Sequence, residues 1–426
     1  MKKNLILGVA GVLTALSLAG CSSSGASNDN PAATTGTLRV TVPNFPANND
    51  GQAAFQKVVD HFHQTYPNVK VEPDYVTFNN LNQKLTTSIA SGQVYDVIMS
   101  GVGWIPPLAD RGVIQDMTKL GVQQADVEQE IGKNSPFMDA VMVKDSVYGM
   151  PLVANPRLLA YSKSAFAKAG LDPAKVPQSL DEVRADAKAL TVRDASGKVT
   201  QEGFDFWAAS GNYRQQFVAA LGALGEPLFK DGKQNFNNVA GEKALTWMTD
   251  VISTDKSSEY GVQNSGQTAM VTTGEAAMGF VGPYVDCSDK GIGQAKCNDL
   301  VFFNLKDTKE AMFTGGQIAS VGAGTKLAKP ALEFIKVLRD ESTLESLSSL
   351  NVGIPLSTSD AATKFVQSNP ASTFAQKSLQ SAVFEGGTTN WLTLRTNFGP
   401  TLDEAILKRQ SAKQVLEGLE VTAQAK

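Results

Sequence analysis

Aromatic and amide side chains recur directly after strand-like runs of this sequence. The runs are LRVTV (38–42), YDVIMS (95–100), GMPLVA (149–154), FDFWAAS (204–210) and AAMGFV (276–281). The residues that follow them include Asn44, Phe45, Trp104, Asn155, Asn212, Tyr213, Arg214 and Tyr284. Flat rings cover the apolar face of a pyranose, while amides and the planar arginine fork pair with hydroxyls. This combination indicates a site for a polyhydroxylated ligand.

The position of these residues along the chain supports one shared site. In open α/β sheets, ligands bind in the crevice beyond the carboxyl ends of the strands. Closing such a crevice expels water, and a buried polar group left without a partner costs about 1–3 kcal/mol. That cost would discriminate between similar sugars.

The elements that must position the site alternate between strand and helix. After the strand at 38–42, Phe55, Val58, Val59 and Phe62 fall at helical spacing, and 66–68 ends that helix. A strand at 69–75, a helix at 81–93 and a buried strand at 95–100 follow. The alternation predicts an α/β fold with parallel, doubly wound layers.

Local signals mark helix starts farther along the chain. Ser179 with Glu182 and Thr401 with Glu404 have the spacing of capping boxes, and Pro330 suits a first helical turn. We therefore expect helices to begin near 179, 330 and 401.

The N-terminus predicts export and anchoring. Lys2 and Lys3 precede an apolar stretch that is short for a membrane span, and Leu18-Ala19-Gly20-Cys21 resembles the bacterial lipobox. We expect 1–20 to be a signal peptide, Cys21 to carry the lipid, and the polar segment 21–37 to be a flexible tether. The alternative is an ordinary secretory signal with an incidental cysteine.

The composition of the chain limits the kinds of partner and bound group that we expect. The net charge of −4 favours no nucleic-acid partner, and no later apolar run reaches the length of a membrane span. In an oxidising compartment, Cys287 and Cys297 are expected to form a disulfide, which would stabilise the fold by about 3 kcal/mol. The two histidines, His61 and His63, face different directions on a helix, so we expect no metal site and no cofactor.

Four stretches carry a family resemblance: 91–120, 147–191, 274–284 and 315–357. In this order and spacing they resemble the extracellular solute-binding proteins of ABC importers, family 1, whose members include maltose-binding protein. The resemblance implies a type II periplasmic-binding-protein-like fold, with two doubly wound α/β lobes joined by a hinge and a cleft that closes on ligand. It implies an N-terminal lobe of 38–153 and 313–355, and a C-terminal lobe of 154–312 and 356–426.

The resemblance also implies roles for individual residues. Tyr284 matches a tryptophan of the family pattern, and Trp391 matches an aromatic that stacks on sugar from the C-terminal lobe. The alternative for Trp391 is helix packing with Leu394 and Phe398. The resemblance likewise implies ligand contacts for Trp104, Asn155, the cluster Asn212, Tyr213 and Arg214, the glycine pair Gly315 and Gly316, and Gln317. An asparagine at 212, where the maltose binder has an acid, weakens any inference of maltose itself.

Three other residues have two interpretations from the sequence. Trp207 lies in an apolar run and is expected in the core. Arg157 and Arg395 suit either hydroxyl donation or surface ion pairing.

The resulting hypothesis is a lipid-anchored, monomeric carbohydrate receptor outside the cytoplasm. It would sit on the outer face of the cytoplasmic membrane, or in the periplasm or outer membrane of a Gram-negative host. It would deliver its ligand to the transmembrane subunits of an ABC permease and would not be an enzyme. A polyol or glycerol-phosphate ligand is the alternative in the same fold. An exported glycosidase is disfavoured, because it needs paired carboxylates and the loops above contain almost none.

Overall fold

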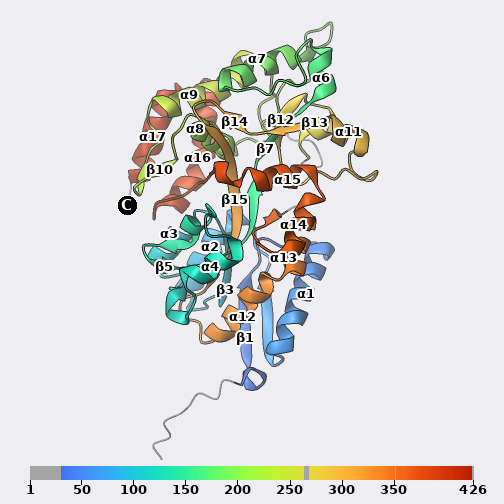
Figure 1. Cartoon of the computed structure of the whole chain (residues 1–426). Helices are drawn as coiled ribbons and strands as arrows, with labels where there is room; N and C mark the ends of the chain where they lie inside the picture. The colour runs from blue at the N-terminus through green and yellow to red at the C-terminus, as the bar shows by residue number, and fades with distance from the viewer. Residues whose placement is uncertain (1–29, 263–267, 351, 425–426) are drawn as a thin grey trace, which may run out of the picture.

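The computed structural model describes residues 30–262, 268–350 and 352–424. The proposed lipobox and Cys21 lie outside these residues. The described chain forms two α/β lobes, one at the bottom and one at the top of Figure 1. Within the described part, no helix is both long and apolar enough to cross a membrane.

A mixed sheet forms the centre of the first lobe, with strand order β16-β6-β15-β3-β1-β2. The strands β2, β1 and β3 run parallel to one another, as the alternation predicts, and β17 (Ala382–Val383) pairs in parallel with β15. The pairs β15–β3, β15–β6 and β16–β6 are antiparallel, so the parallel arrangement does not extend across the whole sheet. The strands are β1 (Gly36–Thr41), β2 (Val69–Asp74), β3 (Val97–Gly101), β6 (Met150–Pro156), β15 (Glu310–Val321) and β16 (Ile354–Pro355).

Helices cover this sheet, and a short hairpin lies beside it. The helices are α1 (Asn49–Thr65), α2 (Phe78–Ala90), α3 (Ile105–Asp110), α4 (Gln124–Ile131), α5 (Met138–Val141), α12 (Ala328–Leu338), α13 (Glu341–Ser349) and α14 (Asp360–Gln367). The hairpin joins β4 (Met142–Val143) to β5 (Ser146–Val147).

The second lobe is built on a smaller sheet in which β7 (Leu158–Ser162) lies between β12 (Met278–Val281) and β13 (Leu300–Phe303), antiparallel to both. Segment 202–205 adds isolated parallel bridges beside β12. The helices are α6 (Lys163–Lys168), α7 (Leu180–Leu190), α8 (Arg214–Ala223), α9 (Val239–Thr249), α10 (Met270–Thr273), α11 (Gln294–Asp299), α15 (Pro370–Lys377), α16 (Trp391–Ile406) and α17 (Ala412–Gln424). Two-residue strands complete it: β8 (Val192–Arg193), β10 (Phe229–Lys230), β11 (Lys233–Gln234), β14 (Leu305–Lys306) and β17 (Ala382–Val383), with three-residue β9 (Val199–Gln201).

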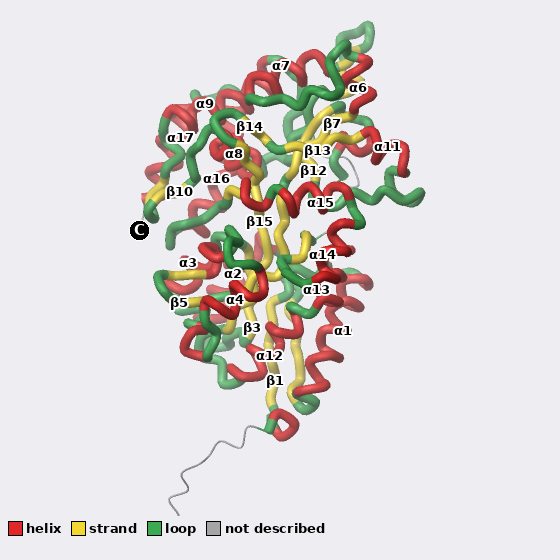
Figure 2. Tube along the Cα trace, in the orientation of Figure 1, coloured by secondary structure: helices red, strands yellow, loops and turns green. Residues whose placement is uncertain are grey.

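Two strand connections join the lobes. Arg157 alone separates β6 of the first sheet from β7 of the second. The long strand β15 pairs with β3 through Gln317–Val321 and with β17 at Met312 and Phe313. Figure 2 shows these strands in yellow running through the middle of the molecule.

Local sequence explains several helix starts. Asn48 caps α1 by accepting from Gly51 N at 2.9 Å, and the predicted apolar face of α1 is buried. Ser179 caps α7, while Glu182 accepts from the backbone of Gln178. Pro330 lies in the first turn of α12. The predicted start at Thr401 is wrong, because α16 begins at Trp391 and runs through Pro400.

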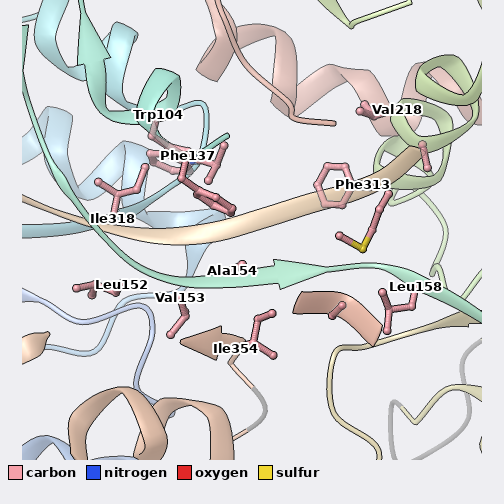
Figure 3. Close-up of a cluster of buried hydrophobic side chains, with 14 of the residues drawn as sticks. Trp104, Phe137, Leu152, Val153, Ala154, Leu158, Val218, Phe313, Ile318 and Ile354 are labelled. Carbon is pink, nitrogen blue, oxygen red and sulfur yellow. The ribbon is translucent and has the colours of Figure 1, made fainter. Parts of the chain in front are cut away.

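The core is continuous along β15 and β6. Figure 3 shows Trp104, Phe137 and Ile318 gathered near one part of β15, and Phe313 farther along it. Apolar burial of this kind stabilises a fold by about 25 cal/mol per Å². In the second lobe, Cys287 and Cys297 form the expected disulfide.

Candidate functional site

Asn44 and Gln317 lie on the first lobe, with buried oxygens that have no hydrogen-bond partner among the described residues. Asn44 follows β1 and donates only to the sulfur of Met99, at 3.6 Å, so its Oδ1 is unpaired. Gln317 pairs with Gly101 in the β15–β3 ladder, and its Oε1 is also unpaired. Such oxygens are suited to accept from hydroxyl groups.

Phe45 and Gly316 are packed against protein rather than presented to a cavity. The Phe45 ring is buried and lies 5.3 Å from the ring of Phe55. A Cβ on Gly316 would lie 2.8 Å from the Phe137 ring and from the Val153 carbonyl oxygen. The glycine is therefore required by strand packing in this conformation.

Trp104 is buried, although the sequence places it among the expected ligand contacts. Its exposed fraction is 2%. The Phe78 ring packs on it edge-on at 6.0 Å, and the guanidinium of Arg395, from the second lobe, lies 5.6 Å from the indole centre. The contact between lobes accounts for its burial.

Glu385, Arg214 and Arg395 form an ion cluster next to this contact. Glu385 accepts from Arg214 Nε at 2.7 Å and from Arg395 Nε at 3.3 Å. Burial alone would raise the pKa of Glu385, but Arg214 and Arg395 together hold it below its ordinary value. Sequence reasoning missed Glu385, and it gave Arg214 a ligand contact where the structure gives an internal ion pair.

A first hollow of about 400 Å³ opens beside this cluster, at the lobe boundary. Gly103 from the first lobe meets Gly386 from the second so closely that a Cβ on Gly103 would lie 2.5 Å from the Glu385 carbonyl oxygen. Phe137 packs edge-on against Phe384 at 5.2 Å, and Gln380 donates to the Asn134 carbonyl. These contacts hold the lobes together along this side.

Trp391 and Tyr213 are also buried. Trp391 packs against Phe229 at 5.8 Å and Phe398 at 6.3 Å, as its helix-packing alternative predicts, and its indole Nε1 has no acceptor among the described residues. Tyr213 stacks on Tyr260, and its hydroxyl accepts from Gly261 N at 2.7 Å. Neighbouring Asn212 is exposed.

A polar chain leads from the hinge to Trp207. Arg157 donates to Asn155 Oδ1 at 2.6 Å and to Gln215 Oε1 at 3.0 Å. Its guanidinium lies 5.0 Å from the centre of the Trp207 ring. The prediction that Trp207 is a core residue is wrong in part, since the side chain is only partly buried.

Trp207 and Tyr284 line a second hollow of about 520 Å³. Most of its wall belongs to the second lobe, but Ser349 comes from the end of α13, which packs on the first lobe. Its volume falls within the roughly 300–1,000 Å³ typical of small-molecule sites.

Two buried acids lie beneath this region. Burial and the neighbouring Asp205 carboxylate raise the pKa of Glu202 to about 8. Burial raises the pKa of Asp205 to about 6, although the backbone N–H groups of Met270 and Trp207 oppose the shift. Across the described residues no cluster of three or more His, Cys, Asp or Glu side chains could hold a metal ion.

Comparison with known proteins defines the family. The profile of the family described as bacterial extracellular solute-binding protein matches residues 46–343. The diacetylchitobiose-binding protein of Streptomyces coelicolor is 25% identical, over 97% of each chain. A multiple sugar-binding protein of Streptococcus mutans is 25% identical over 52% of this chain and 49% of its own.

Solved structures show the same fold. An ABC substrate-binding protein of Listeria monocytogenes, in complex with cycloalternan, superposes with a TM-score of 0.73 at 18% identity, over 92% of this chain and 98% of its own. A Mycobacterium tuberculosis protein in complex with glycerophosphocholine gives a TM-score of 0.73 at 17% identity, over the same shares. The two-lobe architecture is thus shared across structures with different ligands.

Proposed function

The chain belongs to the bacterial extracellular solute-binding protein family, and we propose that it captures a carbohydrate between its lobes for an ABC importer. The observation that carries the carbohydrate class is the lining of the lobe boundary. The rings of Trp207 and Tyr284 share the second hollow with the hydroxyls of three threonines and of Ser349. The full-length similarity to a diacetylchitobiose-binding protein supports the same class.

Lobe opening would give a ligand access to the buried residues. The Trp104–Arg395 contact and the Gly103–Gly386 approach both join one lobe to the other. Hinge motion at β6–β7 and β15 would separate them, as in other two-lobed binding proteins. The unpaired atoms of Asn44, Gln317 and Trp391 would then have partners in ligand hydroxyls.

The remaining expected site residues stay proposals under this function. Asn155 and Arg157 border the hinge, and Tyr284 lines the second hollow. Ligand contact at Phe45, Tyr213, Arg214 and Gly316 requires a rearrangement of the packing described above, whereas Asn212 is already exposed.

Anchoring and delivery complete the proposal. Lipid attachment at Cys21 would keep a monomeric receptor outside the cytoplasm, next to the permease subunits. An uncharacterized lipoprotein of Streptomyces antibioticus, 30% identical over 45% of this chain and 40% of its own, supports this arrangement. The lobe boundaries expected from the sequence stay part of the proposal, except that α14, expected in the C-terminal lobe, packs against α13 and β16 of the first lobe.

A glycerol-phosphate-type ligand is the second candidate. Arg214 and Arg395 share the single carboxylate of Glu385, so the cluster beside the first hollow carries excess positive charge. That charge would suit a phosphate, and a structure with the same fold holds glycerophosphocholine.

Isothermal titration calorimetry separates these candidates. The mature protein would be titrated with N,N′-diacetylchitobiose, mannobiose, maltotriose, glycerol 3-phosphate and glycerophosphocholine. We expect micromolar binding of at least one sugar, about −8 kcal/mol, and none of the phosphates. Heat from a phosphate alone would favour the second candidate, and no heat across the panel would overturn the carbohydrate proposal.

A further inference from the structure

We propose that Trp207 is a stacking platform for a neutral sugar ring in the second hollow, whose lining also includes Tyr284. The proposal rests on the carbohydrate function above and deepens it by choosing between the two hollows. Sequence reasoning placed Trp207 in the core.

The backbone at Trp207 is held in a conformation that a tryptophan rarely adopts. Its φ is +48°, in the left-handed region. Strain of this kind costs about 1–3 kcal/mol and persists where surrounding contacts impose it, often at ligand sites. Here Asp205 imposes it, because its carboxylate accepts from Trp207 N at 2.6 Å and from Met270 N at 2.9 Å. The main chain of Asp205 also pairs with Met278 and Phe280.

Arg157 fixes the indole from the hinge side. The guanidinium lies 5.0 Å from the ring centre and is itself held by Asn155 and Gln215. An indole so placed is preorganised, and a rigid platform loses less conformational entropy when a ligand binds. Since Asn155 lies in β6 and holds Arg157, a movement of the hinge would change the contact between Arg157 and the Trp207 ring.

The wall that carries Tyr284 is equally constrained. Ser372 donates to the Pro283 carbonyl at 2.7 Å, and Asn369 donates to the Val285 carbonyl at 2.7 Å. These two bonds hold the residues on either side of Tyr284 against the start of α15. The loop closed by the Cys287–Cys297 disulfide follows and brings Lys290 to the rim.

The charge of the hollow favours a neutral ligand. Among the described residues, its lining contains one acid, Asp286, one base, Lys290, and the hydroxyls of threonine and serine side chains. The charges balance, so a phosphate gains little, whereas a pyranose finds rings for its faces and hydroxyls for its rim.

The test compares Trp207→Ala and Trp207→Phe with Trp247→Phe. Trp247 is a matched control because it is buried among Phe204 and Phe206, away from the hollow lining. The probe is the sugar of the panel above that gives the largest heat with wild-type protein. We expect Trp207→Ala to weaken binding at least tenfold, Trp207→Phe to weaken it less, and Trp247→Phe to leave affinity within twofold while lowering the melting temperature.

Tryptophan fluorescence keeps the test decisive if Trp207→Ala does not fold. We expect the probe to change the emission of wild-type protein and Trp104→Phe, and to change the emission of Trp207→Phe much less. A signal lost in Trp104→Phe and kept in Trp207→Phe would place the sugar in the first hollow and overturn the proposal. Unchanged affinity in folded Trp207→Ala would overturn it as well. Absence of binding by wild-type protein would instead refute the carbohydrate function.

Discussion

The guanidinium of Arg395 lies 5.6 Å from the centre of the Trp104 indole, and the two residues belong to different lobes. Trp104 follows β3 in the first sheet, whereas Arg395 lies in α16 and is paired with Glu385. A cation–π contact of this kind contributes about 0.5–2 kcal/mol, depending on its desolvation. It is therefore large enough to bias the balance between open and closed lobes.

Trp104→Ala is expected to destabilise the protein as well as loosen this contact. Removing a buried tryptophan typically costs about 3–5 kcal/mol. Denaturant unfolding of Trp104→Ala and Tyr284→Ala measures the difference, since Tyr284 is only partly buried and should cost much less. Equal unfolding midpoints for the two variants would contradict the burial of Trp104.

Arg395→Lys should favour the open form. Lysine keeps the charge but lacks the planar fork that reaches both Trp104 and Glu385. Small-angle scattering of the ligand-free protein should show a larger radius of gyration for Arg395→Lys than for wild type. Arg409→Lys is the control, because its partner Glu404 belongs to the same lobe. Identical radii in all three proteins would exclude a role for Arg395 in lobe closure.

Glu385→Gln should lower the free energy of unfolding by about 3–5 kcal/mol, because it leaves two buried guanidinium groups without their carboxylate. Glu404→Gln, at a more exposed pair, should cost about 1 kcal/mol or less. Because the folded pKa of Glu385 is lowered, its stabilisation is present above the unfolded value near 4.5 and is lost as pH falls through the folded value. Thermal melts of wild type and Glu385→Gln should therefore converge in acid; a constant gap down to pH 3 would refute the ion-pair account.

The raised pKa of Glu202 predicts that stability decreases as pH rises, which is the opposite of the dependence expected for Glu385. The folded pKa of Glu202, about 8, exceeds the ordinary 4.5, so the folded state binds more protons between these values. Stability should then fall as pH rises from about 4.5 to 8. Glu202→Gln should flatten this decline in the melting temperature, whereas exposed Glu417→Gln should not. Parallel curves for wild type and Glu202→Gln would show that the pKa of Glu202 is not raised in the folded state.

Cys21→Ala should release the protein from membranes. Two acyl chains anchor stably, and without them the chain has only its signal segment. Fractionation of cells that express wild type or Cys21→Ala, with radiolabelled palmitate, measures both anchoring and acylation. Ser22→Ala is the control, since it leaves the cysteine in place. Membrane retention of unlabelled Cys21→Ala would disprove the lipobox interpretation.

Features set by local spacing could be predicted from the sequence. The apolar face of α1 and the cap at Ser179 follow from residues within a few positions of one another. The disulfide followed from compartment and from the number of cysteines left after lipidation. The family resemblance supplied the two-lobe architecture, which alternation alone did not reveal.

Features set by distant contacts could not be predicted in this way. Glu385 lies in a glycine-rich turn, and its partner Arg214 is 171 positions away. Trp104 looked exposed because nothing in its loop shows that α16 folds against it. The predicted helix start at Thr401 is wrong for a different reason. The apolar spacing from Trp391 to Phe398 starts α16 earlier, and the helix continues past the local capping signal at Thr401.

The path of the chain through β15 also determines when the first lobe can fold during synthesis. The first sheet places β15 between β3 and β6, and β16 at its edge, so it needs residues 310–355 to be complete. A growing chain must expose unfinished β3 and β6 edges until about four-fifths of it has been made. Since unpaired strand edges are prone to aggregation, the first lobe depends on a late segment of the chain to cover them.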